Sequence, residues 1–210
     1  MRYLLLLMIL ASPSAALALD FRNWKEQRFS LFSGNAYVKT KNTVSIQSDG
    51  TVSLLWSPAP AEMQNANTAR WQWNVTKSVP ATDLTIKGGD DRNLSLYFVF
   101  APAQEISATS GASIKTLMAS PSARVLMYVY GGKHKRGAIL PSPFLKGLGK
   151  TLVLRPAGTG AFTEQVNLEN DFFQAFGEVK TSLVGLAISS DSDDTATAVA
   201  AQISNLMLAQ

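Results

Sequence analysis

The sequence predicts an all-β protein, a two-sheet jelly-roll-like β-sandwich with one short helix. Three observations support this prediction. Short segments in which apolar and polar side chains alternate dominate the chain, glycine and proline separate these segments, and only one segment has helical periodicity. No internal repeat or change in composition marks a second domain, so residues 19–210 are expected to form one sandwich domain.

Six segments carry the strand pattern. In the segment 71–75 both indoles and Val75 face one side, which predicts that Trp71 and Trp73 belong to the core. The segment 94–100 is apolar on nearly both faces, as expected for a central strand covered on both sides. The other predicted strands are 52–56, 124–130, 151–155 and 183–188.

One segment has the periodicity of a helix. Within residues 168–176, Leu168, Phe172 and Phe173 share one face, and Gly177 stands where a C-terminal cap glycine belongs. Residues 196–210 are ambiguous, because their apolar residues fit a helix at first and a strand over 203–209. A closing strand is predicted there.

Residues 1–18 have the pattern of a secretory signal peptide. A basic start at Arg2 precedes an apolar core over residues 3–10, and the small-residue box 16–18 provides a cleavage site. This core is too short to span a bilayer, and no later stretch is long and apolar enough to do so. The sequence therefore predicts a periplasmic or secreted bacterial protein without a transmembrane segment after signal cleavage.

The composition argues against several function classes. The chain has no cysteine and one histidine, so a zinc site or a thiolate nucleophile is not expected. The net charge of +4 is small and scattered, which argues against nucleic-acid binding. No G-x-S-x-G motif accompanies the histidine, so a serine hydrolase is not indicated.

An acidic segment follows the last buried strand, in the sequence SSDSDDT. Asp191, Asp193 and Asp194 offer carboxylate oxygens from one loop, and Ca²⁺ prefers six to eight oxygen ligands. The spacing does not match an EF-hand, because neither the glycine nor the closing glutamate is present. Two interpretations stay open: a Ca²⁺ or ligand site, or a solvated turn whose side chains cap local backbone groups.

A second acidic pair, Asp90 and Asp91, enters a strand just as the first segment leaves one. If these two strands are antiparallel neighbours, both acidic segments lie on the same rim of the sheet. Adjacent carboxylates repel each other, so a cation or an arginine such as Arg92 is expected nearby. The rim is then a candidate site for a metal ion or a sugar. The alternative is again a turn with solvated charges.

The order of these motifs resembles domain-of-unknown-function family 3047. The residues that carry the resemblance are the W-x-W-x-V strand over 71–75, the loop 87–91 that leads into 96–100, and the later segments 164–171, 176–177, 184–188 and 191–193. The chain departs from the family pattern at Gln165, where the family tends to have arginine, and at Asp194, where it usually has asparagine. The resemblance implies a secreted bacterial jelly-roll protein whose activity is not established.

Further residues are candidates for ligand binding. Glu164 and Asp171 fit a glycosidase carboxylate pair, although Asp171 also suits the first turn of the helix, where the helix dipole favours it. His134 stands in a basic cluster, 131–137, which suits either an anionic polymer or a solvated hairpin loop. Trp24 and Trp56 are candidates for a sugar-stacking platform.

Three functions follow from these observations. The first is a non-catalytic protein that binds a carbohydrate or another small polar ligand. The second is a polysaccharide hydrolase or lyase on the same fold, using carboxylates among Asp90, Asp91, Glu164 and Asp171. The third is a structural or assembly protein of the cell envelope.

Overall fold

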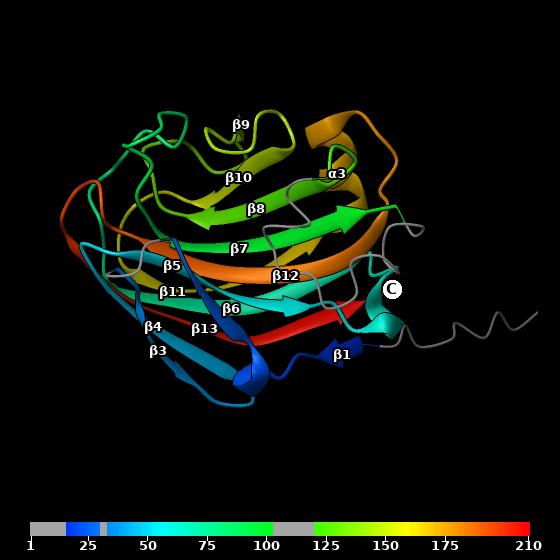
Figure 1. Cartoon of the computed structure of the whole chain (residues 1–210), viewed down its shortest axis with the longest axis horizontal. Coiled ribbons are helices and arrows are strands. Elements are labelled where there is room, and N and C mark those ends of the chain that lie inside the picture. Colours follow the sequence, from blue (N-terminus) through cyan, green and yellow to red (C-terminus); the bar gives the residue numbers. More distant parts are fainter. Residues whose placement is uncertain (1–15, 30–32, 103–119) are drawn as a thin grey trace, which may run out of the picture.

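The chain folds into two stacked β-sheets, shown in Figure 1. The computed structural model describes residues 16–29, 33–102 and 120–210, so the first 15 residues of the predicted signal peptide lie outside the described part. Mostly antiparallel strands form both sheets, and the prediction of a jelly-roll sandwich is confirmed.

Six strands of the described residues form sheet A. Five follow the order β11-β6-β13-β4-β3, and β1 pairs with the end of β13. The strands are β1 (Ala16–Ala18), β3 (Ala36–Lys39), β4 (Thr43–Asp49), β6 (Thr68–Lys77), β11 (Gly160–Asn167) and β13 (Ala198–Ala209). Strand β13 is the closing strand expected over 203–209, and it begins five residues earlier.

In the part of the chain that the structure describes, sheet B has seven strands in the order β2-β5-β12-β7-β8-β10-β9. They are β2 (Lys25–Arg28), β5 (Val52–Pro58), β7 (Arg92–Ala101), β8 (Arg124–Tyr130), β9 (Ile139–Pro141), β10 (Gly149–Arg155) and β12 (Ser182–Asp191). Strands β8 and β10 run parallel, and β12 runs antiparallel to both β5 and β7. All six strands expected from alternation are present.

The main core lies between the sheets, where side chains from the inner faces interdigitate. Trp71 and Trp73 are fully buried on β6, with ring centroids 5.5 Å apart in an edge-to-face arrangement. They pack against Tyr128 and Tyr130 of β8, on the opposite sheet. The prediction that both indoles belong to the core is confirmed.

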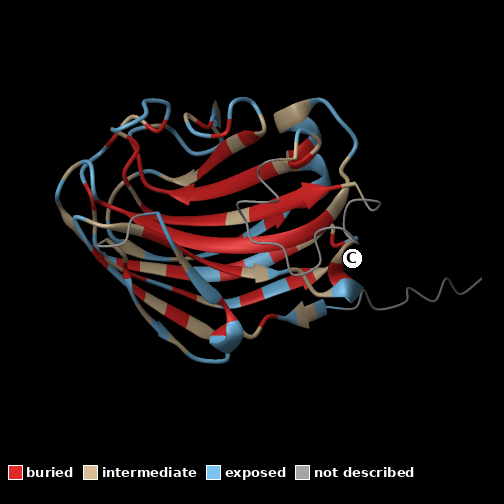
Figure 2. Cartoon of the chain, in the orientation of Figure 1, coloured by how far each residue is buried: buried red, intermediate tan, exposed pale blue. Residues whose placement is uncertain are grey.

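The central strands of sheet B, β7, β8 and β12, are buried along most of their length, as their mainly red ribbons in Figure 2 show. The side of sheet B that faces away from sheet A carries its own apolar cluster, which includes Leu54, Val99, Val125 and Met127. Segments 83–89 and 138–148 contribute side chains to this cluster, such as Leu84. The outer face of sheet B therefore has a floor of apolar side chains and walls formed by loops.

The predicted helix is present as α3 (Leu168–Phe176). The side chain of Asn167 accepts a hydrogen bond from the backbone N–H of Asn170, and Gly177 ends the helix in the left-handed conformation with φ 69°. Phe172 is fully buried and packs edge-to-face against Phe100 of sheet B. Two short 3₁₀ turns, η1 (Phe21–Asn23) and η2 (Ala61–Met63), complete the described helices.

The basic segment 131–137 is not a hairpin loop. Strand β8 before it pairs with β7 and β10, and the chain continues into β9, which pairs with the other edge of β10. The hairpin prediction was wrong because β10 inserts between β8 and β9, and sequence alternation does not specify the order of strands in a sheet.

Candidate functional site

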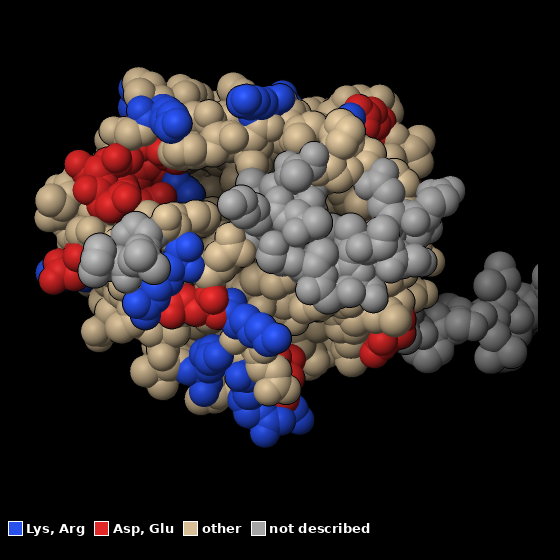
Figure 3. Space-filling model, in the orientation of Figure 1, with Lys and Arg blue, Asp and Glu red and all other residues tan. Residues whose placement is uncertain are grey.

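The two acidic segments meet at one rim of sheet B. Strand β12 ends at Asp191 and pairs with Arg92, the first residue of β7, so the segment 191–194 and the pair Asp90 and Asp91 lie together. This confirms the expectation that antiparallel neighbours would bring both segments to one rim. Figure 3 shows acidic side chains gathered beside a hollow in this face of the molecule.

Arg92 connects the two segments. Its Nη1 lies 2.8 Å from Oδ2 of Asp90 and 3.1 Å from Oδ2 of Asp191. Its Nε donates to the hydroxyl of Ser95 at 2.7 Å, and Nη2 donates to the hydroxyl of Tyr97 at 3.0 Å. The arginine that charge repulsion predicted is therefore present, and it holds Asp90 by a charge-assisted hydrogen bond and Asp191 by an ion pair.

The polar network continues across the sheet to Ser189 of β12, whose hydroxyl lies 3.0 Å from that of Tyr97. Burial alone would lower the pKa of the Arg92 guanidinium, but Tyr97, Asp191 and Asp90 outweigh it and raise the pKa above its ordinary value. Arg92 thus remains a fixed positive charge at the centre of an acidic rim.

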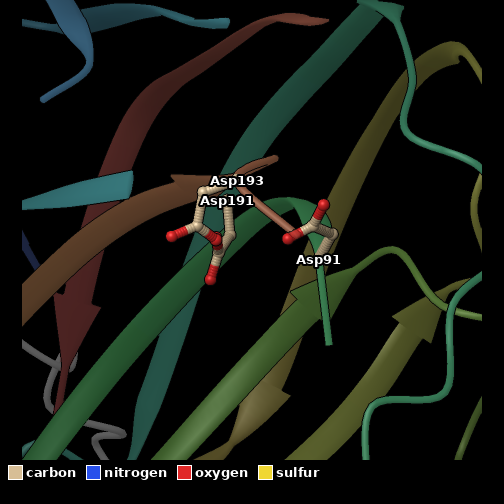
Figure 4. A group of neighbouring side chains, drawn as sticks. All are labelled: Asp91, Asp191 and Asp193. Atoms are coloured by element: carbon tan, nitrogen blue, oxygen red, sulfur yellow. The ribbon is translucent and has the colours of Figure 1, made fainter. Parts of the chain in front are cut away.

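Asp91 holds the segment after β12 in place. Its Oδ2 accepts hydrogen bonds from the backbone N–H and the hydroxyl of Thr195, and its Oδ1 accepts one from the N–H of Asp194 at 3.3 Å. Figure 4 shows the carboxylate of Asp91, at the start of β7, across from Asp191 and Asp193 at the end of β12. Oxygen atoms of these three carboxylates lie within 4.8 Å of one another.

Two buried carboxylate oxygens at the rim have no hydrogen-bond partner among the described residues, Oδ1 of Asp90 and Oδ1 of Asp191. The two residues are only 4% and 7% exposed. Burial raises the pKa of both carboxyls; for Asp191 the charge of Arg92 opposes the rise, and Asp193 and Asp91 add to it. The rim therefore holds two buried carboxylates that the hydrogen bonds and ion pairs of Arg92 satisfy only in part.

The hollow beside the rim is a cleft of about 720 Å³ on the outer face of sheet B. Apolar side chains from β5, β7 and β8 form its floor, among them Leu54, Val99, Val125 and Met127. Arg92, Tyr97 and the acidic rim form one end. The cleft thus combines a largely apolar floor with one charged end.

Two loops wall the cleft. Leu84 and Lys87 come from the segment before the acidic pair, and Phe144 comes from the segment between β9 and β10. The ammonium of Lys87 lies 5.5 Å from the centre of the Phe144 ring. Phe144 is 52% exposed and presents an aromatic ring at the mouth of the cleft.

Glu164 lies away from this cleft, on β11 at the edge of sheet A. It is 2% exposed and forms ion pairs with Arg155 at 2.7 Å and Arg136 at 3.0 Å. Asp171 lies in the first turn of α3, where it accepts a hydrogen bond of 2.8 Å from the hydroxyl of Tyr128. The structure therefore separates both residues from the acidic rim, and neither lines the cleft.

His134 contacts a different carboxylate from those of the rim. Its Nε2 lies 3.4 Å from Asp83, which also pairs with Lys133 at 2.9 Å. Side-chain hydrogen bonds from Thr85 and Lys133 hold the pKa of Asp83 well below its usual range. The histidine thus joins the basic segment to the loop that walls the cleft, and it is not among the residues that line it.

Trp24 and Trp56 are not exposed platforms. Trp24 is 3% exposed and packs edge-to-face on Phe21, and Trp56 is 8% exposed. Strand β12 has glycine at position 185, and the Trp56 ring occupies the space that a Cβ there would need. The platform hypothesis was wrong because Trp24 packs in the core between the sheets and Trp56 packs in the apolar cluster on the outer face of sheet B. Alternation alone cannot show which apolar positions a neighbour covers.

Sequence reasoning missed Tyr97 and Phe144 as site residues. Tyr97 appeared only as part of an apolar strand, yet it is the one polar aromatic within the segment 94–100. Phe144 ends the sequence PSPF, just after β9, and an apolar ring in a proline-rich segment was the available signal. The sequence predicted Asp191, Asp193 and Asp194 as the candidate metal ligands. In the structure the three neighbouring carboxylates are those of Asp91, Asp191 and Asp193, whereas Asp194 lies outside this group and lines the cleft.

Similar folds occur among solved structures. The xyloglucanase domain of NopAA, a type three effector from Sinorhizobium fredii in complex with cellobiose, is 8% identical, with a TM-score of 0.50 over 95% of this chain and 97% of that one. A cellulase derived from Cel12A of Rhodothermus marinus is 11% identical, with a TM-score of 0.46 over 94% of this chain and 100% of that one. At these identities the likeness concerns the fold alone.

No curated protein matches the chain in sequence. Within the described residues, no helix has the length and apolar character needed to cross a bilayer. The model of one family, described as protein of unknown function DUF3047, matches residues 22–207. These residues include the acidic rim and the cleft, and the match agrees with the resemblance seen in the motifs. The chain belongs to the family DUF3047.

Proposed function

We propose that the protein is an exported binding protein that holds a carbohydrate or another small polar ligand in the cleft on the outer face of sheet B. One observation carries this proposal: a cleft of about 720 Å³ joins an apolar floor to a hydrogen-bonding end built on Arg92. Clefts that bind small ligands typically measure about 300–1,000 Å³ and combine apolar walls with a few placed polar groups.

The chemistry of the lining suits a sugar ring. Pyranose rings expose apolar C–H faces and a polar edge of hydroxyl groups. Val99 and Met127 on the floor and the ring of Phe144 at the mouth offer apolar contact to such a face. Arg92 and the buried carboxylates of Asp90 and Asp191 offer donors and acceptors to hydroxyl groups.

The position of the carboxylates favours binding over hydrolysis. A glycosidase pair stands on opposite sides of the scissile bond, about 5–10 Å apart. The carboxylates among the described lining residues all belong to the rim formed by residues 90 and 191–194. The described lining residues that follow β9 or lie in β10 include two polar residues, Ser142 and Thr151, and no carboxylate that could act as the second member of a pair. The Sinorhizobium domain of similar fold holds cellobiose, which makes carbohydrate the first ligand class to test.

Affinity electrophoresis in soluble polysaccharides, followed by calorimetry with the matching oligosaccharides, tests the proposal. We expect retention by at least one polysaccharide and loss of that retention in Phe144→Ala. Phe173→Ala is the matched control, because Phe173 is 57% exposed on α3 and does not line the cleft. No retention by any polysaccharide or small polyol, or equal loss in both variants, would contradict the proposal.

A hydrolase acting in the same cleft is the second candidate. The observation that favours it is the raised pKa of the buried Asp191 carboxyl next to Asp193, since a proton held near neutral pH is what a general acid requires. Release of reducing ends from a retained polysaccharide, abolished in Asp191→Asn, would establish this candidate. Retention without any release of reducing ends would exclude it.

A further inference from the structure

Three carboxylates converge at the charged end of the cleft. Asp91, Asp191 and Asp193 each place an oxygen within 4.8 Å of the others. Two oxygens bound to one Ca²⁺ at its usual distance of about 2.4 Å lie at most about 4.8 Å apart. The three side chains are thus spaced closely enough to reach a single ion. They lie at the ends of two neighbouring strands: Asp91 directly precedes β7, Asp191 ends β12, and Asp193 follows β12.

A second observation points to a ligand at this place. Asp191 is 7% exposed, and its Oδ1 has no hydrogen-bond partner among the described residues, while its Oδ2 faces Arg92. A buried carboxylate oxygen without a partner is costly, and native structures rarely leave one in that state. Oδ1 of Asp90, beside the group in sequence, is unpartnered and buried as well.

Arg92 does not compensate all of the negative charge of these carboxylates. Its guanidinium is committed to Oδ2 of Asp90, Oδ2 of Asp191 and the hydroxyls of Ser95 and Tyr97. It therefore neutralises one side of the cluster and leaves the other oxygens of both carboxylates free. Something with positive charge, a proton or a cation, must occupy the other side.

We propose that Asp91, Asp191 and Asp193 bind a divalent, oxygen-preferring cation of the Ca²⁺ class at the charged end of the cleft. Ca²⁺ accepts irregular sets of carboxylates and water, whereas Mg²⁺ requires near-ideal octahedral geometry. Asp193 is exposed, so the ion has a path from solvent and room for water ligands. The inference does not depend on the cleft binding a sugar, because the carboxylates alone define the site.

Such an ion would also fix the relation between two strand ends. Asp91 already orders the segment after β12 through its hydrogen bonds to Asp194 and Thr195. Binding of a cation to Asp191 and Asp193 of the same segment would tie it to the start of β7 a second time. Since the unfolded chain does not assemble this group, the cation should raise the stability of the folded state.

Calorimetric titration of the EDTA-stripped full-length mature protein with CaCl₂, paired with thermal melting, tests the site without any sugar present. We expect one ion bound per chain and a higher melting midpoint with Ca²⁺ than with EDTA. Asp193→Asn is the main variant because Asp193 is exposed and the fold should tolerate the change. It should weaken Ca²⁺ binding at least about tenfold.

Glu62→Gln is the matched control. Glu62 is exposed in η2, and the substitution removes one negative charge, as Asp193→Asn does, but away from the rim. It should leave the affinity for Ca²⁺ unchanged, and Mg²⁺ should bind more weakly than Ca²⁺ to the wild type. The inference is overturned if millimolar Ca²⁺ produces neither heat nor a melting shift, which would assign a proton to the cluster. It is also overturned if Asp193→Asn binds Ca²⁺ as tightly as the wild type.

Discussion

Arg92 shows how one residue creates the charged end of the cleft. It begins β7, so its backbone is held by pairing with β12, and its side chain runs along the outer face of sheet B. The guanidinium contacts two carboxylates and two hydroxyls, and the planar arrangement of its donors suits this set better than a lysine ammonium would. The charged end is therefore rigid before any ligand arrives.

Asp171 provides a prediction at the scale of a single residue. Burial raises the pKa of its carboxyl, although the hydrogen bond from Tyr128 opposes the rise. The folded protein then keeps a proton on Asp171 at pH values where the unfolded chain has lost it, so the stability contributed by this group falls as pH rises through that range. Asp171→Asn keeps an acceptor for Tyr128 and cannot ionise.

We expect the free energy of unfolding of Asp171→Asn, relative to wild type, to increase as the pH rises above about 3.9, the ordinary pKa of an aspartate. Urea denaturation at several pH values measures this difference. Asp90, Asp191 and Asp194 have pKa values raised by burial as well, but they are the same in both proteins and cancel in the comparison. Parallel pH profiles for the two proteins would show that Asp171 ionises equally in both states.

At the scale of elements, helix α3 depends on the cap at its start. Asn167 ends β11 and caps α3, because its side chain accepts from the N–H of Asn170 at 2.9 Å. Asn167→Ala removes this bond and should lower the free energy of unfolding by about 1 kcal/mol in urea denaturation. Asn167→Ser retains a capping oxygen and should cost clearly less. An equal loss in both variants would mean that the cap contributes nothing.

Alternation predicted the buried strands well, because a face that packs must be apolar at every second position. The strand 124–130 and the helix 168–176 have the predicted bounds. Strand β11 was missed, and Glu164 explains why: it occupies a buried position between Phe162 and Val166, so the apolar pattern is interrupted. Arg155 of β10 and Arg136 of the segment between β8 and β9 neutralise it, and no local pattern records such long-range pairs.

The site was predictable only in part, because local sequence patterns do not record contacts between segments that are distant in the sequence. The acidic segments and their shared rim followed from two strand ends and the antiparallel rule. The cleft itself depends on which strands neighbour each other and on where the loops 83–89 and 142–145 fold back. Phe144 lies 53 residues from Asp91 in the sequence, and only the strand order of sheet B places both at one cleft.

At the scale of the whole molecule, the two sheets have different surroundings. Sheet A covers the inner face of sheet B, and loops only partly cover the outer face, which leaves the cleft there. A sheet face that is apolar and not covered by another layer is a ready surface for a ligand. The fold therefore accounts for the place of the cleft, and the ends of β7 and β12 account for its polarity.

The predicted signal cleavage after Ala18 provides a test at this scale. Strand β1 pairs three residues with the end of β13. Leu19 and Phe21, which follow β1, are buried, and the N–H of Leu19 donates to the carbonyl of Leu206. Cleavage after Ala18 would remove β1 and leave these anchors in place. We expect N-terminal sequencing of the exported protein to begin at Leu19, and circular dichroism to show a folded β protein.

Two results would contradict this prediction. An exported protein that retains residues 16–18 would mean that cleavage occurs earlier. A chain starting at Leu19 that fails to fold would mean that β1 is required, although it pairs with only three residues of β13.

Chemical-shift mapping tests the central claim, that the outer face of sheet B is the binding site, most directly. ¹⁵N-labelled protein would be titrated with a panel of soluble oligosaccharides and small polyols. The account predicts saturable shifts of backbone amides around Arg92, Tyr97, Ser189 and Phe144, which line or border the cleft. Shifts confined to the shallow groove on sheet A, around Gln72, Asn74 and Gln202, or no shifts with any compound, would contradict it.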